Sequence, residues 1–503
     1  MSLKRKAAGV SSSRCGQAVA VLSVPAMLAL MVALAVAGYL LASSRVAGLG
    51  FPLDDAWIHQ TYARSLAHTG QWAYLPGEPS AGSTSPLWSL LLAAGYRLGV
   101  NPLAWAYLLG GLALFGLALA GQHFLHELSP ARSALPWAGL FLVGEWHLVW
   151  AAGSGMETIP YAALILVVLV LVSRAGGRGW GWVGILIGIG VWLRPDALTL
   201  LGPAGLVMLL GEKGWRQRWL ALGWLTLGFL LLFGPYLWFN LQIQGSLWPN
   251  TLYAKQAEYA QLQNLPWLQR FADQLKLPLI GAGIFLLPGF VRCLWVSIQR
   301  RAWLALAAAI WFLGFAGLYA LRLPVVYQYG RYLIPAMPVF FVVALAGLLD
   351  LVRLGSSNRA AWILTRTWAF SVVGVWLAFY GLVAGLYARD VAIIETEMVA
   401  AAHWVAANTE PDALIAAHDI GALGYFGQRR LVDLAGLISP DVIPFMRDEA
   451  ALARWLDAQQ VDYLVTFPGW YSQLAEGKQP VFTSGAAYSL EAGGENMWVY
   501  RWR

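Results

Sequence analysis

Two adjacent carboxylates, Asp54 and Asp55, follow the first long apolar run of the chain and could carry out acid–base chemistry. Adjacent acids beside an apolar segment are unfavourable unless they are paired, bound to a cation or in contact with water. A carboxylate whose pKa is raised by burial or by a like charge can serve as a general base on a hydroxyl group. The alternative is structural: Asp54 caps a short helix and Asp55 is a solvated acid in its first turn. The residues leave both interpretations open.

Two cations in later polar segments have types and positions that suit a phosphate. Lys255 lies in the segment GSLWPNTLYAK, and Arg331, followed by Tyr332, lies just before an apolar run. At the level of lipid headgroups, Lys and Arg side chains bind phosphate through charge-assisted hydrogen bonds. Each cation also has an explanation without chemistry, Lys255 as an interfacial lysine and Arg331 as an arginine that reaches the headgroups. Two acids and two cations on one side of a membrane favour the joint interpretation.

Ionisable residues at the ends of other apolar runs usually face a cavity or a polar partner. Glu157 lies in the segment SGMET, and Arg194 stands before a Pro-Asp break. For Glu157 a structural explanation, a salt bridge or cap at a helix end, is preferred. The candidates for binding an acceptor or lining a cavity are Glu78, Thr84, Glu157, Arg194 and Asn250.

Two further polar pairs are predicted to be structural. Glu145 and His147 lie inside a short apolar run and are expected to bond to each other. His418 and Asp419 suggest metal ligands or a proton relay, but two side chains without a third ligand do not define a metal site. We therefore expect His418 and Asp419 to make a contact in the loop after a strand.

The composition excludes a soluble chain. Of the 503 residues, 59% are hydrophobic and 12% are charged, whereas a soluble domain has roughly 45–50% and about 25%. The net charge of +7 comes from short basic clusters between apolar runs, which the positive-inside rule explains. Nucleic acid is therefore excluded as a partner, and the lipid bilayer is the expected one.

Motifs for other chemistries are missing from the sequence. The chain has no Walker-type phosphate loop, no Gly-x-Gly-x-x-Gly after a strand, no cysteine–histidine metal spacing and no Gly-x-Ser-x-Gly elbow. Nucleotide-driven pumping and soluble nucleotide-sugar chemistry both lose support. No metal ligand and no cofactor are predicted, although a divalent cation at the acidic pair is left open.

Apolar runs divide the chain into a membrane part and a soluble tail. The first run, about Val19 to Ala42, follows basic residues and is long enough to span a bilayer, so the N-terminus is predicted to be cytoplasmic. If every apolar run crosses the membrane in turn from a cytoplasmic N-terminus, the segments between residues 86 and 156 do not fit a cytoplasmic position of the later basic loops. One of these segments therefore does not cross, or two of them form one span. We predict a polytopic α-helical membrane protein with about 11 to 13 transmembrane helices in residues 1–389. Its outer loops are expected at 43–85, 242–276 and 321–332.

The tail, residues 390–503, is predicted to be a small soluble extracytoplasmic α/β domain. Short apolar runs alternate with segments of helical periodicity, which favours an open sheet covered by helices. The expected elements are helices at 394–408 and 449–459 and strands at 414–417, 431–434 and 463–466. The first outer loop is predicted to begin with an amphipathic helix along the membrane surface, because apolar residues recur there at helical spacing: Trp57, Ile58, Tyr62 and Leu66.

A series of segments resembles membrane glycosyltransferases of the GT-C superfamily: DDAWI with YARSLAHTG, PGEPSAGSTSPLW, SGMET, WLRPDAL, GSLWPNTLYAK and GRYLIPAMP. The sequence is most similar to the terminal β-(1→2)-arabinofuranosyltransferases that finish cell-wall arabinan. The similarity spans nearly the whole chain, including IGALGYF and LVDLAGL in the tail. It implies a polyprenyl-phosphate sugar donor bound from the outer leaflet and an acceptor glycan outside the cell. The family's acidic pair maps onto Asp54 and Asp55, and its donor-phosphate contacts map onto Lys255, Arg331 and Tyr332.

The resulting hypothesis is a plasma-membrane glycosyltransferase that acts on an extracytoplasmic glycan, lipid or protein, with arabinofuranose as the sugar to which the resemblance leans. Asp54 deprotonates the acceptor hydroxyl, Asp55 orients Asp54, and a single inverting displacement follows. A second hypothesis is a lipid-glycan flippase or transporter, which predicts matched broken helices in two related halves. A third is a non-catalytic cell-envelope scaffold whose acidic tail recruits a cell-wall partner.

Overall fold

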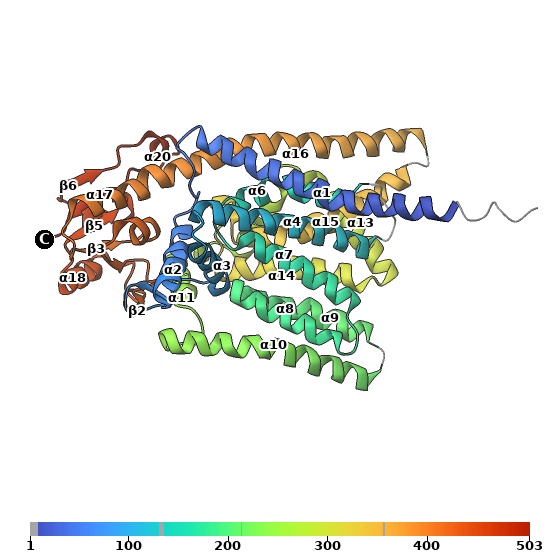
Figure 1. The fold of residues 1–503 in the computed structure, drawn as a ribbon, viewed down its shortest axis with the longest axis horizontal. Coiled ribbons are helices and arrows are strands. Elements are labelled where there is room, and N and C mark those ends of the chain that lie inside the picture. Colours follow the sequence, from blue (N-terminus) through green and yellow to red (C-terminus); the bar gives the residue numbers. More distant parts are fainter. Residues whose placement is uncertain (1–8, 130–134, 213, 356–357) are drawn as a thin grey trace, which may run out of the picture.

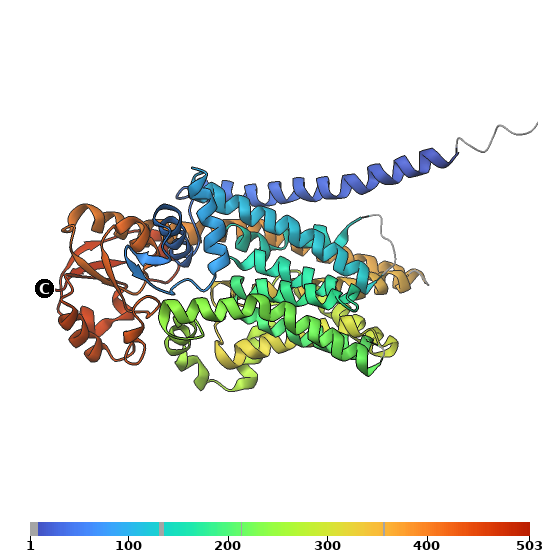
Figure 2. The ribbon, with the colours of Figure 1, turned by 60° about the horizontal axis from the view of Figure 1, so that its bottom comes forward.

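A computed structural model describes residues 9–129, 135–212, 214–355 and 358–503, with side chains in these ranges from residue 24 onward. The structure is a long bundle of helices with a small α/β unit at one end (Figures 1 and 2). Helices suit the apolar runs because a helix satisfies its own backbone hydrogen bonds where no water is available. The charged tail, in contrast, folds around a sheet.

Within the described residues, six helices are long and apolar enough to cross a membrane, and one bent pair would make a seventh. The bent pair joins the segments Trp267–Leu279 and Gly283–Arg300 at 106°. Such lengths match the thickness of a bilayer, and the predicted polytopic helical membrane protein is confirmed. The long helices are α1 (Gly9–Ser44), α4 (Pro102–Leu128), α10 (Trp215–Gln244), α14 (Trp303–Arg322), α15 (Met337–Leu354) and α16 (Arg359–Ile394), and the bent pair contains α12 (Trp267–Lys276) and α13 (Gly283–Arg300).

Shorter helices fill the bundle between the long ones. Helix α3 has 12 residues, and α5 and α6 are separated at Glu145, so each is shorter than the roughly 20 residues of a full span. These lengths agree with the prediction that a segment between 86 and 156 does not cross by itself. Helix lengths do not test the count of 11 to 13 spans, which stays a prediction. The short helices are α3 (Pro86–Arg97), α5 (Trp137–Gly144), α6 (Trp146–Ala152), α7 (Thr158–Arg174), α8 (Gly179–Leu193) and α9 (Leu201–Gly211).

Glu145 marks the break between α5 and α6 and caps the second helix. Its carboxylate accepts hydrogen bonds from the backbone N–H groups of His147 and Leu148, at 3.1 and 3.3 Å. Its Oε1 atom lies 2.8 Å from Nδ1 of His147. The predicted structural pair of Glu145 and His147 is therefore confirmed.

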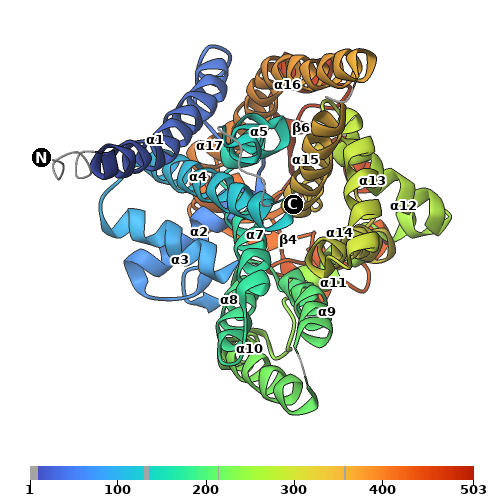
Figure 3. The same ribbon diagram turned by 90° about the vertical axis from the view of Figure 1, so that its right-hand side faces the viewer.

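Close packing of α8 against α10 depends on glycine. A Cβ atom at Gly184 would lie 2.1 Å from the carbonyl oxygen of Leu225, and one at Gly228 would lie 2.1 Å from the carbonyl oxygen of Gly181. Small residues let helix backbones approach each other in a bilayer, where packing replaces the hydrophobic effect between helices. The end-on view in Figure 3 shows this pair at the edge of the bundle.

The predicted outer loops and the tail gather at one end of the bundle (Figure 1). The first loop forms α2 (Asp55–Thr69) and a hairpin of β1 (Ala73–Leu75) and β2 (Glu78–Pro79), and the second contains α11 (Asn250–Glu258). The starts of α10 and α16, next to basic residues, lie at the opposite end. The predicted outer loops and the tail thus lie at one end of the bundle, and the basic starts of α10 and α16 lie at the other. The side of the membrane that each end faces stays a prediction.

Helix α2 is present where the sequence predicts it, and most of it packs against other parts of the protein. Nine of its 15 residues are buried. The Trp57 ring packs 4.8 Å from that of Tyr425 and 4.7 Å from that of Phe426, both in the tail. The apolar spacing therefore reflects contacts with the tail and with α3, while a position of α2 along the membrane surface stays a prediction.

The tail forms a five-stranded sheet with the order β4-β3-β5-β7-β6. The strands β4, β3 and β5 are parallel, and β7 and β6 are antiparallel. The predicted strands are all present, with β4 shifted by one residue, whereas β6 and β7 were not predicted. The predicted boundary at 389/390 lies inside α16. The tail elements are β3 (Leu414–Ala417), β4 (Arg430–Asp433), β5 (Tyr463–Thr466), β6 (Pro480–Thr483), β7 (Trp498–Arg501), α17 (Ala400–Asn408), α18 (Glu449–Gln459), α19 (Ser472–Ala475) and α20 (Ala487–Glu491).

Candidate functional site

A cavity of about 1100 Å³ opens between the loop end of the bundle and the tail. Its walls come from the first loop, from α11, from the turn before α15, from the end of α16 and from the tail. The structure brings together there four of the five residues predicted for catalysis and phosphate binding. We define the cavity cluster as seven ionisable residues that line this space: Asp54, Asp55, Lys255, Glu258, Arg331, His418 and Asp419.

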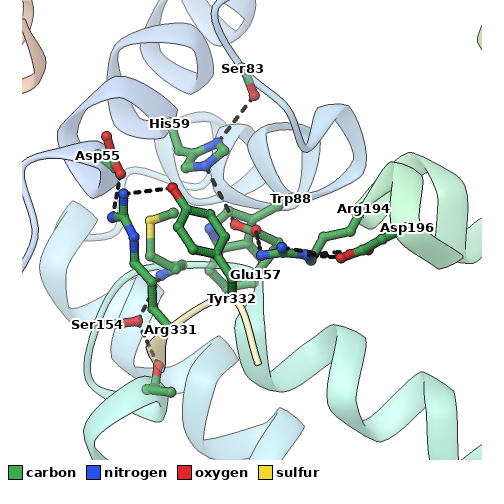
Figure 4. A network of polar contacts seen from close by, with 12 residues as sticks. Asp55, His59, Ser83, Trp88, Ser154, Glu157, Arg194, Asp196, Arg331 and Tyr332 are labelled. Carbon is green, nitrogen blue, oxygen red and sulfur yellow. Dashed lines mark hydrogen bonds and ion pairs between the residues drawn. The ribbon is translucent and has the colours of Figure 1, made fainter. Parts of the chain in front are cut away.

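Asp55 and Arg331 form an ion pair across the cavity wall (Figure 4). Asp55 is the first residue of α2, and Arg331 follows a turn with left-handed backbone at Gln328, Tyr329 and Gly330. Burial alone would raise the pKa of Asp55, but the charges of Arg331 and Lys255 outweigh it and hold that pKa below its usual value. Asp55 is therefore an ionised, partnered acid, not the solvated first-turn acid of the structural alternative.

Arg331 keeps one donor unused. Its Nη1 bonds to Asp55 and its Nη2 donates to the Tyr332 hydroxyl oxygen at 3.0 Å, whereas its buried Nε has no partner. A guanidinium that lines the cavity, held in place by Asp55, is suited to bind a phosphate there. Tyr332 does not line the cavity; its ring stacks on Tyr319, with ring centres 5.9 Å apart, and it supports Arg331 from behind.

Lys255 reaches the cavity from α11 and pairs with an acid that the sequence analysis missed. Its Nζ lies 3.2 Å from Oε2 of Glu258, one helical turn later. Burial would raise the pKa of Glu258, but Lys255 and His418 outweigh it and lower that pKa. The i,i+3 spacing of Lys255 and Glu258 was the available signal for this pair.

Asp54 connects the first loop to the tail. Its carboxylate accepts hydrogen bonds from the backbone N–H groups of Gly421 at 2.6 Å and Ala422 at 2.8 Å, and it makes no capping bond to its own helix. The predicted capping alternative is therefore wrong for α2, because Asp54 caps a turn of the tail. Burial, followed by the charge of Asp419, raises the pKa of Asp54 to about 8, against the opposing effect of the two N–H groups.

The tail dyad, which we define as His418 and Asp419, contacts the cavity cluster and not only its own loop. Nδ1 of His418 lies 2.8 Å from the Tyr471 hydroxyl, and its Nε2 lies 3.6 Å from Oε1 of Glu258. The buried Oδ2 of Asp419 has no hydrogen-bond partner. The prediction of a simple loop contact missed this position, although the dyad follows β3 at the carboxyl end of a parallel strand, where sites are common.

Glu157 and Arg194 make a second set of polar contacts, which Figure 4 shows next to the pair of Asp55 and Arg331. Arg194 is 3.3 Å from Glu157 and 3.2 Å from Asp196, and it donates to the Tyr319 hydroxyl at 2.8 Å. Glu157 also lies 3.5 Å from Nε2 of His59. We call these five residues the bundle network. The preferred structural explanation of Glu157, a salt bridge at a helix end, matches this geometry.

The remaining predicted residues lie outside the cavity wall. Glu78 is exposed on β2, and Thr84 is half-buried in the segment before α3. Asn250 begins α11, and its backbone N–H donates to Oε1 of Gln244 at 3.0 Å. None of the five residues predicted to bind an acceptor or line the cavity, Glu157 and Arg194 included, is among the residues that line it.

The described residues contain no group of three or more Asp, Glu, His or Cys arranged to hold a metal ion. The two oxygens of Asp54 accept backbone N–H groups and Asp55 pairs with Arg331. The carboxylates of Asp54 and Asp55 are thus directed to protein groups and not to a common centre.

Comparisons with known proteins cover the tail and the whole fold. A family model described as a domain of unknown function (DUF8728) matches residues 389–500. No curated protein sequence matches the chain. ArnT from Cupriavidus metallidurans, solved with bound undecaprenyl phosphate, has a TM-score of 0.60 at 15% identity, over 94% of this chain and 97% of that chain.

Two further solved structures share the architecture. The oligosaccharyltransferase AglB from Archaeoglobus fulgidus, solved with an inhibitory peptide and a dolichol-phosphate, has a TM-score of 0.58 at 11% identity, over 90% of this chain and 70% of that chain. The arabinofuranosyltransferase AftD from Mycobacteria has a TM-score of 0.50 at 15% identity, over 94% of this chain and 41% of that chain. At these identities the likeness concerns the fold, which is the predicted one: this chain is a polytopic membrane protein with the GT-C fold.

Proposed function

We propose that this protein transfers a sugar from a polyprenyl-phosphate donor to an acceptor on the outer face of the plasma membrane. One observation carries the proposal: residues from separate loops bring two carboxylates and two cations to the wall of a single cavity. Glycosyl transfer needs a base for the acceptor hydroxyl and positive charge for the departing phosphate. The cavity offers both kinds of group.

The donor phosphate is proposed to bind Arg331 and Lys255. Arg331 lines the cavity, and its guanidinium can supply positive charge to a phosphate while it stays bonded to Asp55 and Tyr332. Two proteins of the same fold were solved with undecaprenyl phosphate and with a dolichol-phosphate. A lipid-linked phosphate is therefore the ligand class that this pair of cations suits.

The base is proposed to be Asp54. Burial and the charge of Asp419 raise its pKa, so its ionised carboxylate is a stronger base toward a hydroxyl than that of an ordinary aspartate. The proton passes from the acceptor hydroxyl to Asp54 as the oxygen attacks the anomeric carbon, and the carbon–oxygen bond to phosphate breaks with its electrons on the phosphate. Asp55 acts by fixing Arg331. The displacement inverts the anomeric centre.

The sugar is proposed to be arabinofuranose and the acceptor a cell-wall glycan. The sequence segments that resemble terminal arabinofuranosyltransferases support this choice, and so does the structural likeness to AftD. Mass spectrometry of the lipid that copurifies with the protein would identify the donor. A lipid phosphate that carries a hexose would replace the pentose in the proposal.

The proposal is tested by Asp54→Asn in membranes supplied with polyprenyl-phosphate arabinofuranose. We expect product formation to collapse by about 10²–10⁴-fold, because the amide cannot accept the proton. Because Asp54 also caps the turn at Gly421, the thermal unfolding midpoint of the variant is measured in parallel. Asp441→Asn changes an exposed tail acid outside the cavity and serves as the matched control. Near-normal turnover in folded Asp54→Asn would reject Asp54 as the base.

The two other hypotheses make different predictions. A flippase of the inverted-repeat type needs matched broken helices in two halves, whereas the described residues contain one strongly bent helix pair, Trp267–Leu279 with Gly283–Arg300. A scaffold would consume no lipid-linked sugar. Absence of sugar release from every polyprenyl-phosphate donor tested, with folded wild-type protein, would favour the scaffold.

A further inference from the structure

Three neighbouring aromatic residues of the tail line the cavity, and they differ in how far they are exposed. Phe467 and Tyr471 are buried, whereas Trp470, which lies between them in the chain, is 51% exposed. A single exposed indole on an outer surface needs no explanation. This indole, however, lies on the wall of the cavity that holds the proposed reaction centre, and ligand pockets are typically lined by aromatic side chains with a few polar groups beside them.

The neighbours of Trp470 hold its ring in a fixed orientation. The ring centre lies 5.2 Å from that of Phe467 and 5.0 Å from that of His418, whose ring plane stands at 85° to the indole. Oε2 of Glu495 accepts a hydrogen bond of 2.7 Å from the N–H group of Gly469, the residue before Trp470. A Cβ atom at Gly469 would lie 2.6 Å from Oε1 of Glu495, so the close approach of this carboxylate depends on glycine.

A chain of contacts connects Trp470 to one of the cations proposed for the donor phosphate. His418 packs against Trp470, and its Nε2 lies 3.6 Å from Oε1 of Glu258. Oε2 of Glu258 lies 3.2 Å from Nζ of Lys255. A hydrogen bond of 2.8 Å from Arg447 to the backbone of α11 is a second tie between the tail and this helix. The position of the indole relative to Lys255 is therefore fixed by the packing of the tail on α11.

We infer that Trp470 is a stacking platform for a sugar ring of the acceptor glycan. The inference rests on the proposed function and names the place where its acceptor binds. One face of a sugar ring consists of C–H groups, which suit the electron-rich face of an indole. The hydroxyl groups at the edge of the sugar suit a carboxylate, and Glu495 is exposed, lines the same wall and lies beside the turn that carries Trp470.

The location of Trp470 favours the acceptor over the donor as its ligand. The proposed phosphate ligands Lys255 and Arg331 belong to α11 and to the turn before α15, on the bundle side of the cavity. Trp470 follows β5 in the tail, which forms the end of the molecule beyond the bundle (Figure 1). A lipid-linked donor reaches the cavity from the bilayer, whereas a glycan reaches it from water. The tail wall is thus the side on which a water-borne chain of sugars can lie.

The first test measures acceptor binding without donor. Full-length protein in detergent is titrated calorimetrically with a short arabino-oligosaccharide. Trp470→Ala should weaken binding about tenfold or more, because a stacked tryptophan usually dominates such a contact. Trp470→Phe should retain part of the affinity, and Trp470→Leu, which is apolar but has no ring, should lose it as the alanine variant does.

The matched control is Trp502→Ala. Trp502 is a tail tryptophan outside the cavity, half-buried, with its ring 4.1 Å from Nζ of Lys478. We expect wild-type affinity for the oligosaccharide in this variant. The thermal midpoint of each variant is measured in parallel, so that loss of folding is distinguished from loss of binding. Wild-type affinity in folded Trp470→Ala would overturn the inference.

The second test separates acceptor from donor in the kinetics of sugar transfer. In Trp470→Ala the acceptor KM should rise about tenfold, while the donor KM and kcat at saturating acceptor stay within about threefold of wild type, since a lost binding contact acts on KM. A residue with a merely structural role would lower kcat and the thermal midpoint instead. A rise in the donor KM with an unchanged acceptor KM would assign Trp470 to the donor sugar and overturn the inference.

The outcomes distinguish the acceptor platform from the proposed function. If the wild-type protein consumes no lipid-linked sugar, the proposed function fails, whatever the oligosaccharide titration shows. If the wild type is active, an unchanged acceptor KM in folded Trp470→Ala overturns the platform alone. Loss of affinity in the alanine and leucine variants, with partial retention in Trp470→Phe, supports it.

Discussion

The cavity cluster and the bundle network contain similar kinds of residues, but they differ in whether these residues line the cavity. In the bundle network, Arg194 is surrounded by Glu157, Asp196 and Tyr319, and none of them lines the cavity. Both regions contain buried atoms without a hydrogen-bond partner, Oε2 of Glu157 in the bundle network and Nε of Arg331 and Oδ2 of Asp419 in the cavity cluster. Of the two regions, the cavity cluster is the one that lies beside a large open volume. Both regions hold an arginine paired with an acid, and the region beside the cavity leaves room for a ligand.

Whether a charged residue lines the cavity distinguishes residues that stabilise the fold from residues proposed to act on a substrate. Residue type alone does not make this distinction. A buried ion pair whose partners are complete resists removal of either member, because the other charge is left uncompensated. A buried donor or acceptor without a partner is unfavourable until a ligand arrives. We therefore expect substitutions in the bundle network to change folding and substitutions in the cavity cluster to change turnover.

The largest expected effect is on turnover at Arg331. Arg331→Gln removes the charge proposed for the phosphate, and kcat/KM for the lipid-linked sugar should fall about a thousandfold, or ~4 kcal/mol. The thermal midpoint should change little, since Asp55 reaches the open cavity and can be hydrated there. Arg322→Gln, an exposed arginine outside the cavity, is the control for loss of a charge. A folded Arg331→Gln with more than a tenth of wild-type turnover would contradict the comparison.

Arg194 should show the opposite behaviour. Arg194→Met leaves Glu157 and Asp196 uncompensated in the bundle, and the free energy of unfolding should fall by about 3 kcal/mol. The measurement is the thermal midpoint in detergent, together with activity per folded molecule, which should be mostly retained. Arg174→Met breaks an ion pair with Glu127 in which the arginine side chain is 55% exposed, and it should cost at most about 1 kcal/mol. Equal losses in the two variants would remove the distinction.

In the tail, the sequence predicts the elements that are controlled by a local pattern of apolar residues. The parallel strands β3, β4 and β5 are short apolar runs, and three elements of the tail were placed to the residue: Leu414–Ala417, Glu449–Gln459 and Tyr463–Thr466. Strand β6 escaped prediction because its residues alternate between half-buried and exposed and it begins with Pro480. Strand β7 is fixed by its pairing with β5 and β6, which no local pattern encodes.

The site was predictable only where a residue lies in a recognisable segment. Asp54, Asp55, Lys255 and Arg331 were found in that way, and the structure brings all four to one cavity. Their partners were not found, because contacts between distant parts of the chain have no local signature. Asp54 bonds to a backbone group 367 residues later, and the contact between Glu258 and His418 depends on how the tail packs.

The smallest expected effect is at the residue that joins the two regions. The Tyr332 hydroxyl accepts from Arg331 in the cavity cluster, while its ring stacks on Tyr319 in the bundle network. Tyr332→Phe keeps the stacking and removes one hydrogen bond, so turnover should fall about threefold to tenfold with an unchanged thermal midpoint. Tyr319→Phe removes a hydroxyl that donates to Asp196 at 2.5 Å, and it should lower the midpoint while turnover per folded molecule stays high. If the two variants exchanged these effects, Tyr332 would belong to the framework and Tyr319 to the site, and the boundary between the regions would have to be moved.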